Sequence, residues 1–172
     1  ARIKTAGLFE QRYGRFEARI KLPIGQGIWP AFWMLGANFD AVGWPQCGEI
    51  DIMEFLGHEP DSVHSTLHGP GYSGGGSIGQ RMTLADGARF DEDFHLFAVT
   101  WDPTRLTFSV DNEVHYTVKM QSIPPDGWVF NQPFFMILNV AVGGHWPGSP
   151  DETTPFPATM LIDYVRVWER AP

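Results

Sequence analysis

The stretch that decides the fold is Gly48-Glu49-Ile50-Asp51-Ile52-Met53-Glu54-Phe55-Leu56. Its isoleucine content and its flanking glycines predict a buried β-strand. Side chains alternate between the two faces of a strand, so Glu49 and Asp51 would share one face and Glu54 would lie on the other. A one-residue β-bulge at Ile52-Met53 would instead bring all three carboxylates to the same face. We expect this bulge, because a single carboxylate pointing into an apolar core is costly.

Three carboxylates on one face indicate acid–base chemistry. Retaining hydrolysis of a glycosidic bond uses two carboxyl groups about 5–5.5 Å apart, one as nucleophile and one as acid and base. Crowded like charges raise a pKa, so one glutamate can keep its proton near neutral pH. Two other interpretations are open at this point, a solvated acidic face and a site for a hard cation with several oxygen ligands. The apolar residues between the acids argue against the solvated face.

The composition is that of a globular chain with one domain over residues 1–172. Hydrophobic residues make up 43% of the sequence and charged residues 19%, which excludes a disordered chain. A net charge of −8 without a basic patch argues against a nucleic-acid partner. No apolar run approaches the roughly 20 residues of a membrane span. The single cysteine, Cys47, excludes an internal disulfide, and we expect a small buried residue rather than a catalytic thiol.

Short strands alternate with turn signals along the whole chain. Besides the acidic strand, the pattern predicts strands at residues 2–5, 14–22, 28–35, 62–68, 94–101, 106–110, 113–117, 134–142 and 159–168. The glycine-rich segment 69–79 is predicted to be a flexible surface loop. About ten short strands with almost no helix predict an all-β sandwich of two packed antiparallel sheets.

Four segments resemble family 16 of the glycoside hydrolases. The acidic segment 49–54 is similar to the bulged form of the family signature, which laminarinases (endo-1,3-β-glucanases), agarases and carrageenases carry. The others are segments 13–21, 27–35 and 161–167, so the resemblance covers essentially the whole chain. It implies a jelly-roll sandwich with a substrate cleft on the concave sheet. Members of the family normally have several strands before Arg2, and no signal peptide is present, so we expect an N-terminally incomplete catalytic domain.

The resemblance assigns a role to each acid. Glu49 would be the nucleophile that forms the glycosyl-enzyme, and Glu54 the acid that later acts as base. Asp51 would orient Glu49. The implied activity is retaining endo-hydrolysis of β-1,3-glucan of the laminarin type, with mixed-linkage β-1,3-1,4-glucan as a further substrate. The implied enzyme is a secreted, extracellular monomer that needs no cofactor for catalysis.

Aromatic side chains are candidate sugar platforms, because an aromatic ring stacks on the apolar face of a pyranose. The candidates are Trp29, Trp33, Trp44 and Trp146, with packing in the core as the alternative for each. Trp44 and Trp146 lie in loops rich in glycine and proline, which favours exposure in a cleft. We expect Trp101 and Trp168 to lie in the core.

Three polar residues complete the predicted substrate site. His68 would contact a sugar hydroxyl or the catalytic carboxylates, with a structural role as the alternative. Asn139 is an amide within an apolar strand and needs partners, so it faces the cleft or holds a loop. Arg2 matches the position of a subsite arginine in the family. Asp163 is the candidate ligand for a structural calcium, because members of the family often hold one on the convex side.

Two rival functions are weighed against the glucanase. An agarase, carrageenase or transglycosylase would use the same acids, but a strongly anionic galactan calls for a basic cleft and the net charge of −8 gives no support for one. A non-catalytic β-glucan-binding module is the rival from another class. Such relatives lose the acids, whereas Glu49 and Glu54 are both present here.

Overall fold

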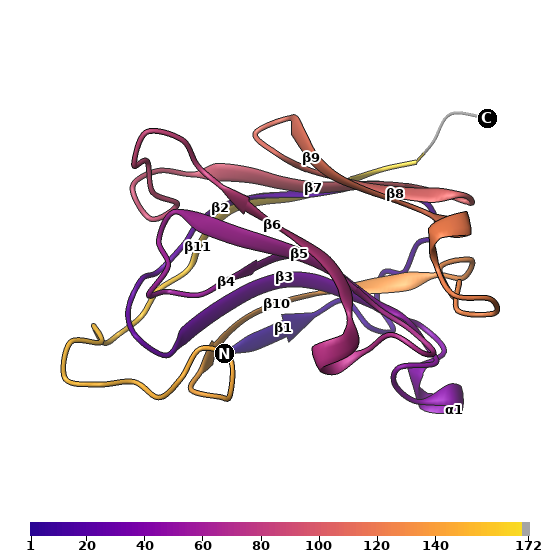
Figure 1. Cartoon of the computed structure of the whole chain (residues 1–172), viewed down its shortest axis with the longest axis horizontal. Helices are drawn as coiled ribbons and strands as arrows, with labels where there is room; N and C mark the ends of the chain where they lie inside the picture. Colours follow the sequence, from indigo (N-terminus) through magenta and orange to yellow (C-terminus); the bar gives the residue numbers. More distant parts are fainter. Residues whose placement is uncertain (170–172) are drawn as a thin grey trace.

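The computed structural model describes residues 1–169 and shows a jelly-roll sandwich of two antiparallel sheets (Figure 1). One sheet has six strands in the order β1-β10-β3-β4-β5-β6, and the other has five in the order β11-β2-β7-β8-β9. The strands are β1 (Arg2–Lys4), β2 (Gly14–Lys21), β3 (Ile28–Gly36), β4 (Glu49–Phe55), β5 (Ser62–His68), β6 (Ile78–Thr83), β7 (His95–Asp102), β8 (Arg105–Val110), β9 (Glu113–Lys119), β10 (Phe134–Val142) and β11 (Leu161–Trp168). The short helical turns are α1 (Phe39–Val42), η1 (Gly74–Gly76) and η2 (Met120–Ser122).

The predicted strands are all present, with ends within two residues of the expected ones. The prediction of a loop over residues 69–79 was wrong at its end, because β6 begins at Ile78 and pairs with β5. Gly79, Gln80 and Arg81 give β6 little hydrophobic alternation. Its backbone hydrogen bonds to β5 therefore decide a conformation that its side chains do not signal.

The core lies between the two sheets and contains many large aromatic side chains. Phe16, Phe32, Phe97 and Phe108 have no exposed surface. Trp101 is 1% exposed, as predicted, and its indole N–H donates to the carbonyl oxygen of Phe130 at 3.0 Å. These buried side chains form one cluster that packs the two sheets against each other.

The prediction of a buried Trp168 was wrong, since this side chain is 43% exposed. It lies on β11, which pairs only with β2 at the edge of its sheet. The register of β11 shifts between Ile162 and Tyr164, so Asp163 is an extra residue opposite β2. This bulge reverses the alternation of the residues that follow, and Trp168 turns away from the core.

The bulge predicted in the acidic strand is present. Between β4 and β3, Asp51 lies opposite Trp33 and Met53 opposite Phe32, which leaves Ile52 as the extra residue. The register between β4 and β5 also shifts between Asp51 and Glu54. The bulge therefore brings Glu54 to the same face as the other two acids, as the sequence predicted.

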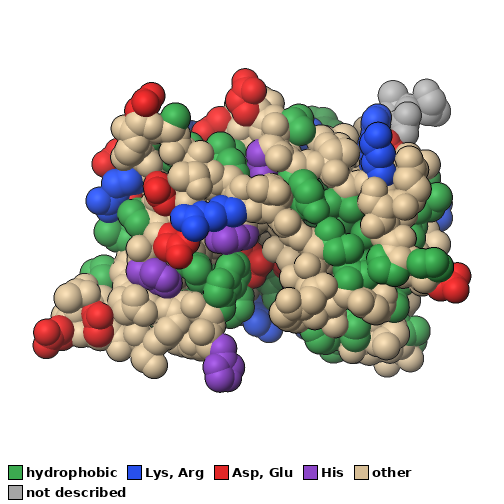
Figure 2. Space-filling model, viewed as in Figure 1, with side chains coloured by type: hydrophobic (Ala, Val, Ile, Leu, Met, Phe, Trp, Pro, Cys, Tyr) green, Lys and Arg blue, Asp and Glu red, His purple; other side chains and the backbone are tan. Residues whose placement is uncertain are grey.

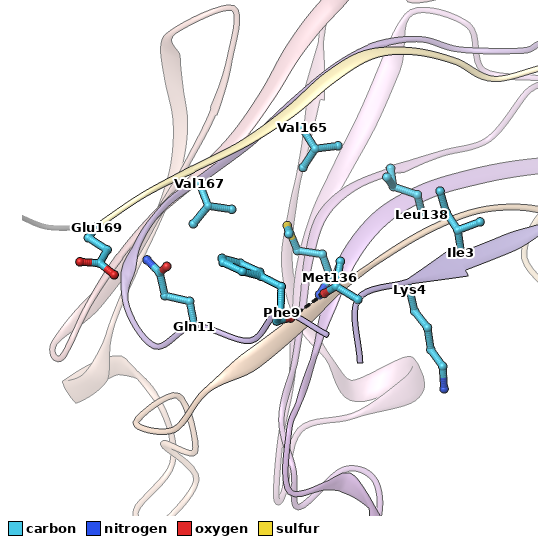
Figure 3. A pocket seen from close by; sticks show the side chains of 10 residues that line it. Ile3, Lys4, Phe9, Gln11, Met136, Leu138, Val165, Val167 and Glu169 are labelled. Carbon is cyan, nitrogen blue, oxygen red and sulfur yellow. Dashed lines mark hydrogen bonds between the residues drawn. The ribbon is translucent and has the colours of Figure 1, made fainter. Parts of the chain in front are cut away.

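A hollow of about 620 Å³ opens at the edge of the sandwich where β1 and β11 each pair with a single neighbour. Figure 3 shows apolar side chains around it, among them Ile3, Phe9 and Met136 on one side and Val165 and Val167 on the other. No acid of β4 lines it, so it is separate from the predicted cleft.

Cys47 belongs to a small second cluster with Leu35, Phe135 and Ile137. Its thiol is free and fully buried, which confirms the prediction of a small buried residue. Burial is the main cause that raises the pKa of this thiol, so the reactive thiolate is disfavoured. No helix within residues 1–169 is long and apolar enough to cross a membrane.

Candidate active site

The outer face of the six-stranded sheet aligns the predicted residues in rows. Glu54 lies opposite Ala31 of β3, which lies opposite Asn139 of β10, which lies opposite Arg2 of β1. On its other side, Glu54 lies opposite His64 of β5. Directly paired residues of antiparallel strands point to the same side, so this row brings residues far apart in sequence onto one face.

A second and a third row carry the other two acids. Asp51 lies between Trp33 of β3 and Thr66 of β5. Glu49 lies opposite His68 of β5. The three acids, Trp33, Asn139, Arg2 and His68 therefore share one face of the sheet.

Glu49 is held by an indole and lies beside a second acid. Trp44 donates its Nε1–H to Glu49 Oε2 at 2.9 Å. Burial is the main cause that raises the pKa of Glu49 to about 8, and the charge of Asp51 raises it further. His68 and the Trp44 hydrogen bond act in the opposite direction, because both favour the ionised carboxylate.

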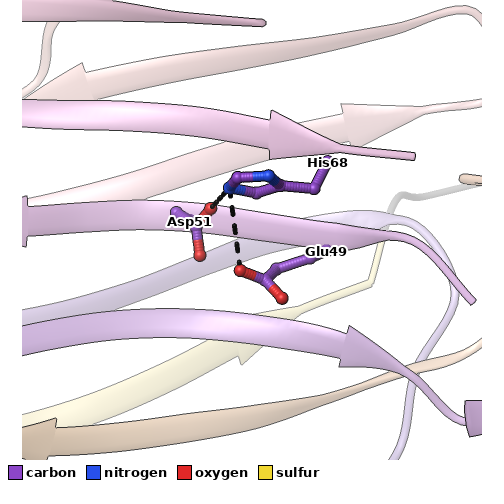
Figure 4. A group of neighbouring side chains, drawn as sticks. All are labelled: Glu49, Asp51 and His68. Atoms are coloured by element: carbon purple, nitrogen blue, oxygen red, sulfur yellow. Dashed lines mark ion pairs between the residues drawn. The ribbon is translucent and has the colours of Figure 1, made fainter. Parts of the chain in front are cut away.

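Asp51 is the most buried of the three acids, with 2% of its surface exposed. His68 Nε2 lies 3.2 Å from Asp51 Oδ2 and 3.8 Å from Glu49 Oε1, as Figure 4 shows. The other ring nitrogen, Nδ1, accepts the backbone N–H of Gly74, so Nε2 carries a hydrogen toward the acids. Of the contacts expected for His68, the structure shows the one to the carboxylates of β4.

Glu54 is 8% exposed and accepts a hydrogen bond from Thr66 Oγ1 at 3.1 Å. Burial raises its pKa to about 7, while the Thr66 hydrogen bond lowers it. The indole N–H of Trp29 is buried and faces Glu54 without a hydrogen bond of good geometry, yet it also favours the carboxylate. A carboxyl group with a pKa near neutrality can both donate and accept a proton.

A groove of about 750 Å³ passes over Glu49 and Glu54. The residues that line it are Trp29, Glu49, Glu54, His64, Thr66, His68, Gly74, Gly75, Ser77, Gly79, Gln80, Arg81, His145 and Trp146. Trp146 is 42% exposed, and its ring lies edge-on to those of Trp29 at 5.4 Å and His64 at 4.9 Å. Figure 2 shows acidic side chains at the bottom of a hollow near the middle of the molecule. The groove thus combines partly exposed aromatic side chains with buried acids.

The model of the glycosyl hydrolases of family 16 matches residues 1–166. The chain belongs to this family. Its fold superposes with a TM-score of 0.97 on the laminarinase catalytic domain from Thermotoga maritima, with 54% identity over 100% of this chain and 70% of that one. The endo-β-1,3-glucanase from Pyrococcus furiosus gives a TM-score of 0.95 and 55% identity over 98% of this chain and 65% of that one.

Among curated relatives, a β-glucanase from Rhodothermus marinus is 41% identical over 182 aligned residues. The alignment covers 98% of this family 16 chain and 61% of the relative. The chain therefore spans less than two thirds of that relative's length.

Some predicted residues of this family 16 chain lie beside the groove rather than in its lining. Trp33 is half-buried and donates its indole N–H to Asn139 Oδ1 at 2.7 Å. The guanidinium of Arg2 lies 5.5 Å from the centre of the Trp33 ring. Asn139 thus has the partner that a buried amide needs, and all three residues extend the same face toward β1.

Several residues that line the groove were not predicted from the sequence. Thr66 and His64 lie two and four residues before His68 on β5, so the two-residue period of a strand places all three on the same face. Arg81 and Gly79 come from β6, which was not predicted. Gly79 lies opposite Thr66, at the end of the row that contains Asp51. Because Gly79 has no side chain, the groove stays open at this end.

The residues around Asp163 do not form a calcium site by themselves. The Asp163 carboxylate pairs with Arg19 Nη1 at 2.9 Å, and both side chains are partly exposed. Calcium takes six to eight oxygen ligands, and a neighbouring guanidinium opposes a second positive charge. Within residues 1–169, the one group of three acid, histidine or cysteine side chains close enough to share an ion is Glu49, Asp51 and His68. The calcium site stays a prediction.

Proposed function

We propose that this protein is a retaining endo-1,3-β-glucanase that acts on glucans of the laminarin type. The observation that carries the proposal is the bulge at Ile52, which turns Glu49, Asp51 and Glu54 to one face of the sheet, where Glu49 and Glu54 line one groove. The names of the two solved relatives, a laminarinase and an endo-β-1,3-glucanase, support the substrate.

The reaction would proceed by double displacement. Glu54 gives its proton to the glycosidic oxygen while a Glu49 oxygen attacks the anomeric carbon, so the leaving chain departs as an alcohol and a glycosyl ester forms. Glu54, now ionised, then takes a proton from water, whose oxygen attacks the same carbon and releases Glu49. Two inversions leave the β configuration unchanged.

The first step needs an ionised Glu49 and a protonated Glu54. Glu49 and Asp51 are neighbouring carboxyl groups, and burial raises the pKa of each, so two adjacent negative charges are unfavourable and the pair keeps one shared proton. Burial raises the pKa of Asp51 well above its usual range, and Asp51 is the less exposed of the two. We place the shared proton on Asp51, where it leaves Glu49 ionised, with the Trp44 N–H and His68 beside it.

The groove favours internal cleavage of a polymer. Its walls come from β5, β6 and the loop that carries His145 and Trp146, and the acids lie along its floor. An exposed Trp146 beside Trp29 gives a sugar ring an apolar platform near the acids. We propose an extracellular site of action, because a glucan polymer is too large to enter a cell, and a monomeric enzyme.

The two rivals make different demands on the groove. An anionic galactan would need several unpaired cations, but Arg81 of the groove already pairs with Glu59 and Asp61. A binding module needs no acids with raised pKa values, whereas burial raises those of Glu49 and Glu54 to about 8 and 7. Both observations favour a neutral glucan and catalysis.

Reducing-sugar release from laminarin, mixed-linkage β-glucan, agarose and carrageenan tests the proposal. We expect release from laminarin by the wild type, loss of this release in Glu49→Gln, and retention in Asp163→Asn, a matched carboxylate-to-amide change outside the groove. Proton NMR of the first product should show the β anomer. Release from a galactan alone would move the substrate to the rival enzymes, and no release from any polymer would overturn the proposed activity.

A further inference from the structure

The bulge that positions Glu54 is held from inside the sandwich by Ser65. Ile52 lies opposite no residue of β3 or β5 in the strand register, and its carbonyl oxygen accepts the hydroxyl hydrogen of Ser65 at 2.9 Å. Ser65 is 1% exposed and points toward the core, whereas the next residue, Thr66, donates to Glu54 on the groove side. Two neighbouring residues of β5 thus hold the bulge and the acid from opposite faces.

Ser65 is contacted in turn by a side chain of the other sheet. His115 Nε2 lies 3.2 Å from Ser65 Oγ. The register between β8 and β9 shifts between Phe108 and Ser109, so His115 is opposite no residue of β8 and forms a second bulge. A bulge directs successive residues to one side, and His115 and Tyr116 are both half-buried. Two bulges, one in each sheet, are therefore linked through one serine.

The hydrogen-bond inventory determines which tautomer His115 adopts. A serine hydroxyl has one hydrogen, and Ser65 gives it to Ile52, so the hydrogen between Ser65 and His115 must come from Nε2. His115 Nδ1 is buried and has no hydrogen-bond partner among residues 1–169. A buried nitrogen without a hydrogen-bond partner is unfavourable. The hydrogen bond from Nε2 to Ser65 therefore has to offset this cost and hold the ring in its observed position.

We propose that His115 is a positioning residue for Glu54, acting through Ser65 and the Ile52 carbonyl. The inference rests on the proposed function, in which Glu54 donates a proton to the leaving oxygen. Without the Nε2–H donor, the Ser65 hydroxyl is free to rotate away from Ile52, and the bulge loses the bond that holds it from the core side. Glu54 follows Ile52 by two residues on the same strand, so a shift of the bulge moves its carboxyl group.

Two replacements of His115 separate the Nε2 contact from the rest of the ring. His115→Gln places an amide N–H near the position of Nε2, whereas His115→Asn places it near that of Nδ1. We expect His115→Gln to retain activity and His115→Asn to lose it, with Ser65→Ala behaving like His115→Asn. Equal losses in the Gln and Asn variants would overturn the role of the Nε2–H bond.

The choice of substrate distinguishes positioning of Glu54 from a general loss of structure. A dinitrophenyl β-glucan oligosaccharide has a leaving group that departs without a proton, so its kcat/KM does not depend on the acid. We expect His115→Asn to lower kcat/KM on laminarin by roughly 10- to 100-fold and on the dinitrophenyl substrate by a factor of about two. Equal reductions on both substrates would overturn the proposal and indicate a structural role.

The tautomer itself can be measured without any substrate. Nitrogen-15 NMR of the imidazole rings should show His115 of the wild type with its hydrogen on Nε2 and a hydrogen-bond shift that Ser65→Ala removes. A hydrogen on Nδ1 would overturn the proposal even if the variants fail to fold. An inactive wild type with the expected tautomer would contradict the proposed function and leave the link between the bulges standing.

Discussion

Replacing the acid Glu54 with glutamine should stabilise the protein at alkaline pH while it abolishes hydrolysis. Glu54 is 8% exposed, and burial raises its pKa from 4.5 to about 7. A folded-state pKa above the unfolded one means that the folded state binds the proton more tightly. The stability associated with that proton is complete below pH 4.5 and is lost as the pH rises through 7. Glutamine has nearly the same shape and can still accept the Thr66 hydrogen bond, but it does not ionise.

The magnitude follows from the shift. Two and a half pKa units at about 1.4 kcal/mol per unit correspond to about 3 kcal/mol of unfolding free energy that the wild type loses by pH 9. The Glu54→Gln protein does not lose it, so the stability difference between the two proteins should increase by roughly 2–3 kcal/mol from pH 5 to pH 9. Glu49 titrates in both proteins, and its contribution largely cancels.

Urea denaturation at pH 5 and pH 9 measures this difference directly. Glu152→Gln, a change at an exposed glutamate, serves as the control for loss of a surface charge. The control should differ from the wild type by the same small amount at both pH values. A Glu54→Gln protein whose advantage does not increase with pH would refute the reasoning, because Glu54 would then not be a carboxyl group with a burial-raised pKa.

Three further predictions address the pH dependence, the groove and the backbone. Initial rates on laminarin should fall as the pH rises through about 7, where Glu54 loses the proton it donates; a rate that increases from pH 7 to 9 would exclude Glu54 as the acid. Trp146→Ala should raise KM by roughly tenfold with a smaller change in kcat, because an exposed platform binds sugar without touching the reacting bond; an unchanged KM would remove Trp146 from the substrate site. Gly36→Ala should lower the unfolding free energy by about 3 kcal/mol in thermal or urea melts, because a Cβ there would overlap the Cys47 carbonyl; a wild-type melt would contradict the close approach of Gly36 to the backbone of Cys47.

The acidic strand shows how far local physics determines this site. A carboxylate in an apolar strand must reach water or a partner, so Glu49, Asp51 and Glu54 could share a face only through a bulge at Ile52. The bulge can be predicted without knowing which strands lie beside this one, and the structure confirms it. The same holds for the alternating strands, whose period of two marks the core face wherever the strand is regular.

Predictions from side-chain alternation were wrong where hydrogen bonding between strands determined the conformation. The exposure of Trp168 follows from the bulge at Asp163, and β6 forms because β5 offers it a hydrogen-bonding edge. Neither the bulge in β11 nor the pairing of β6 with β5 can be recognised from the side-chain pattern of the strand concerned. The loop residue Trp44 is a similar case, because its bond to Glu49 depends on how the loop returns to the sheet.

The sequence by itself determined the sandwich, the three acids and the face on which they lie, because these follow from side-chain polarity and strand period. The family was indicated by the resemblance of four segments to family 16. Only the tertiary structure decided the pKa values of the acids, the contact of His68 with Asp51, and the link from His115 through Ser65 to the bulge. Those features depend on which groups meet across strands and sheets, and on how much water their packing excludes. Polarity along the chain specifies which side chains turn inward, but not which partners they meet there.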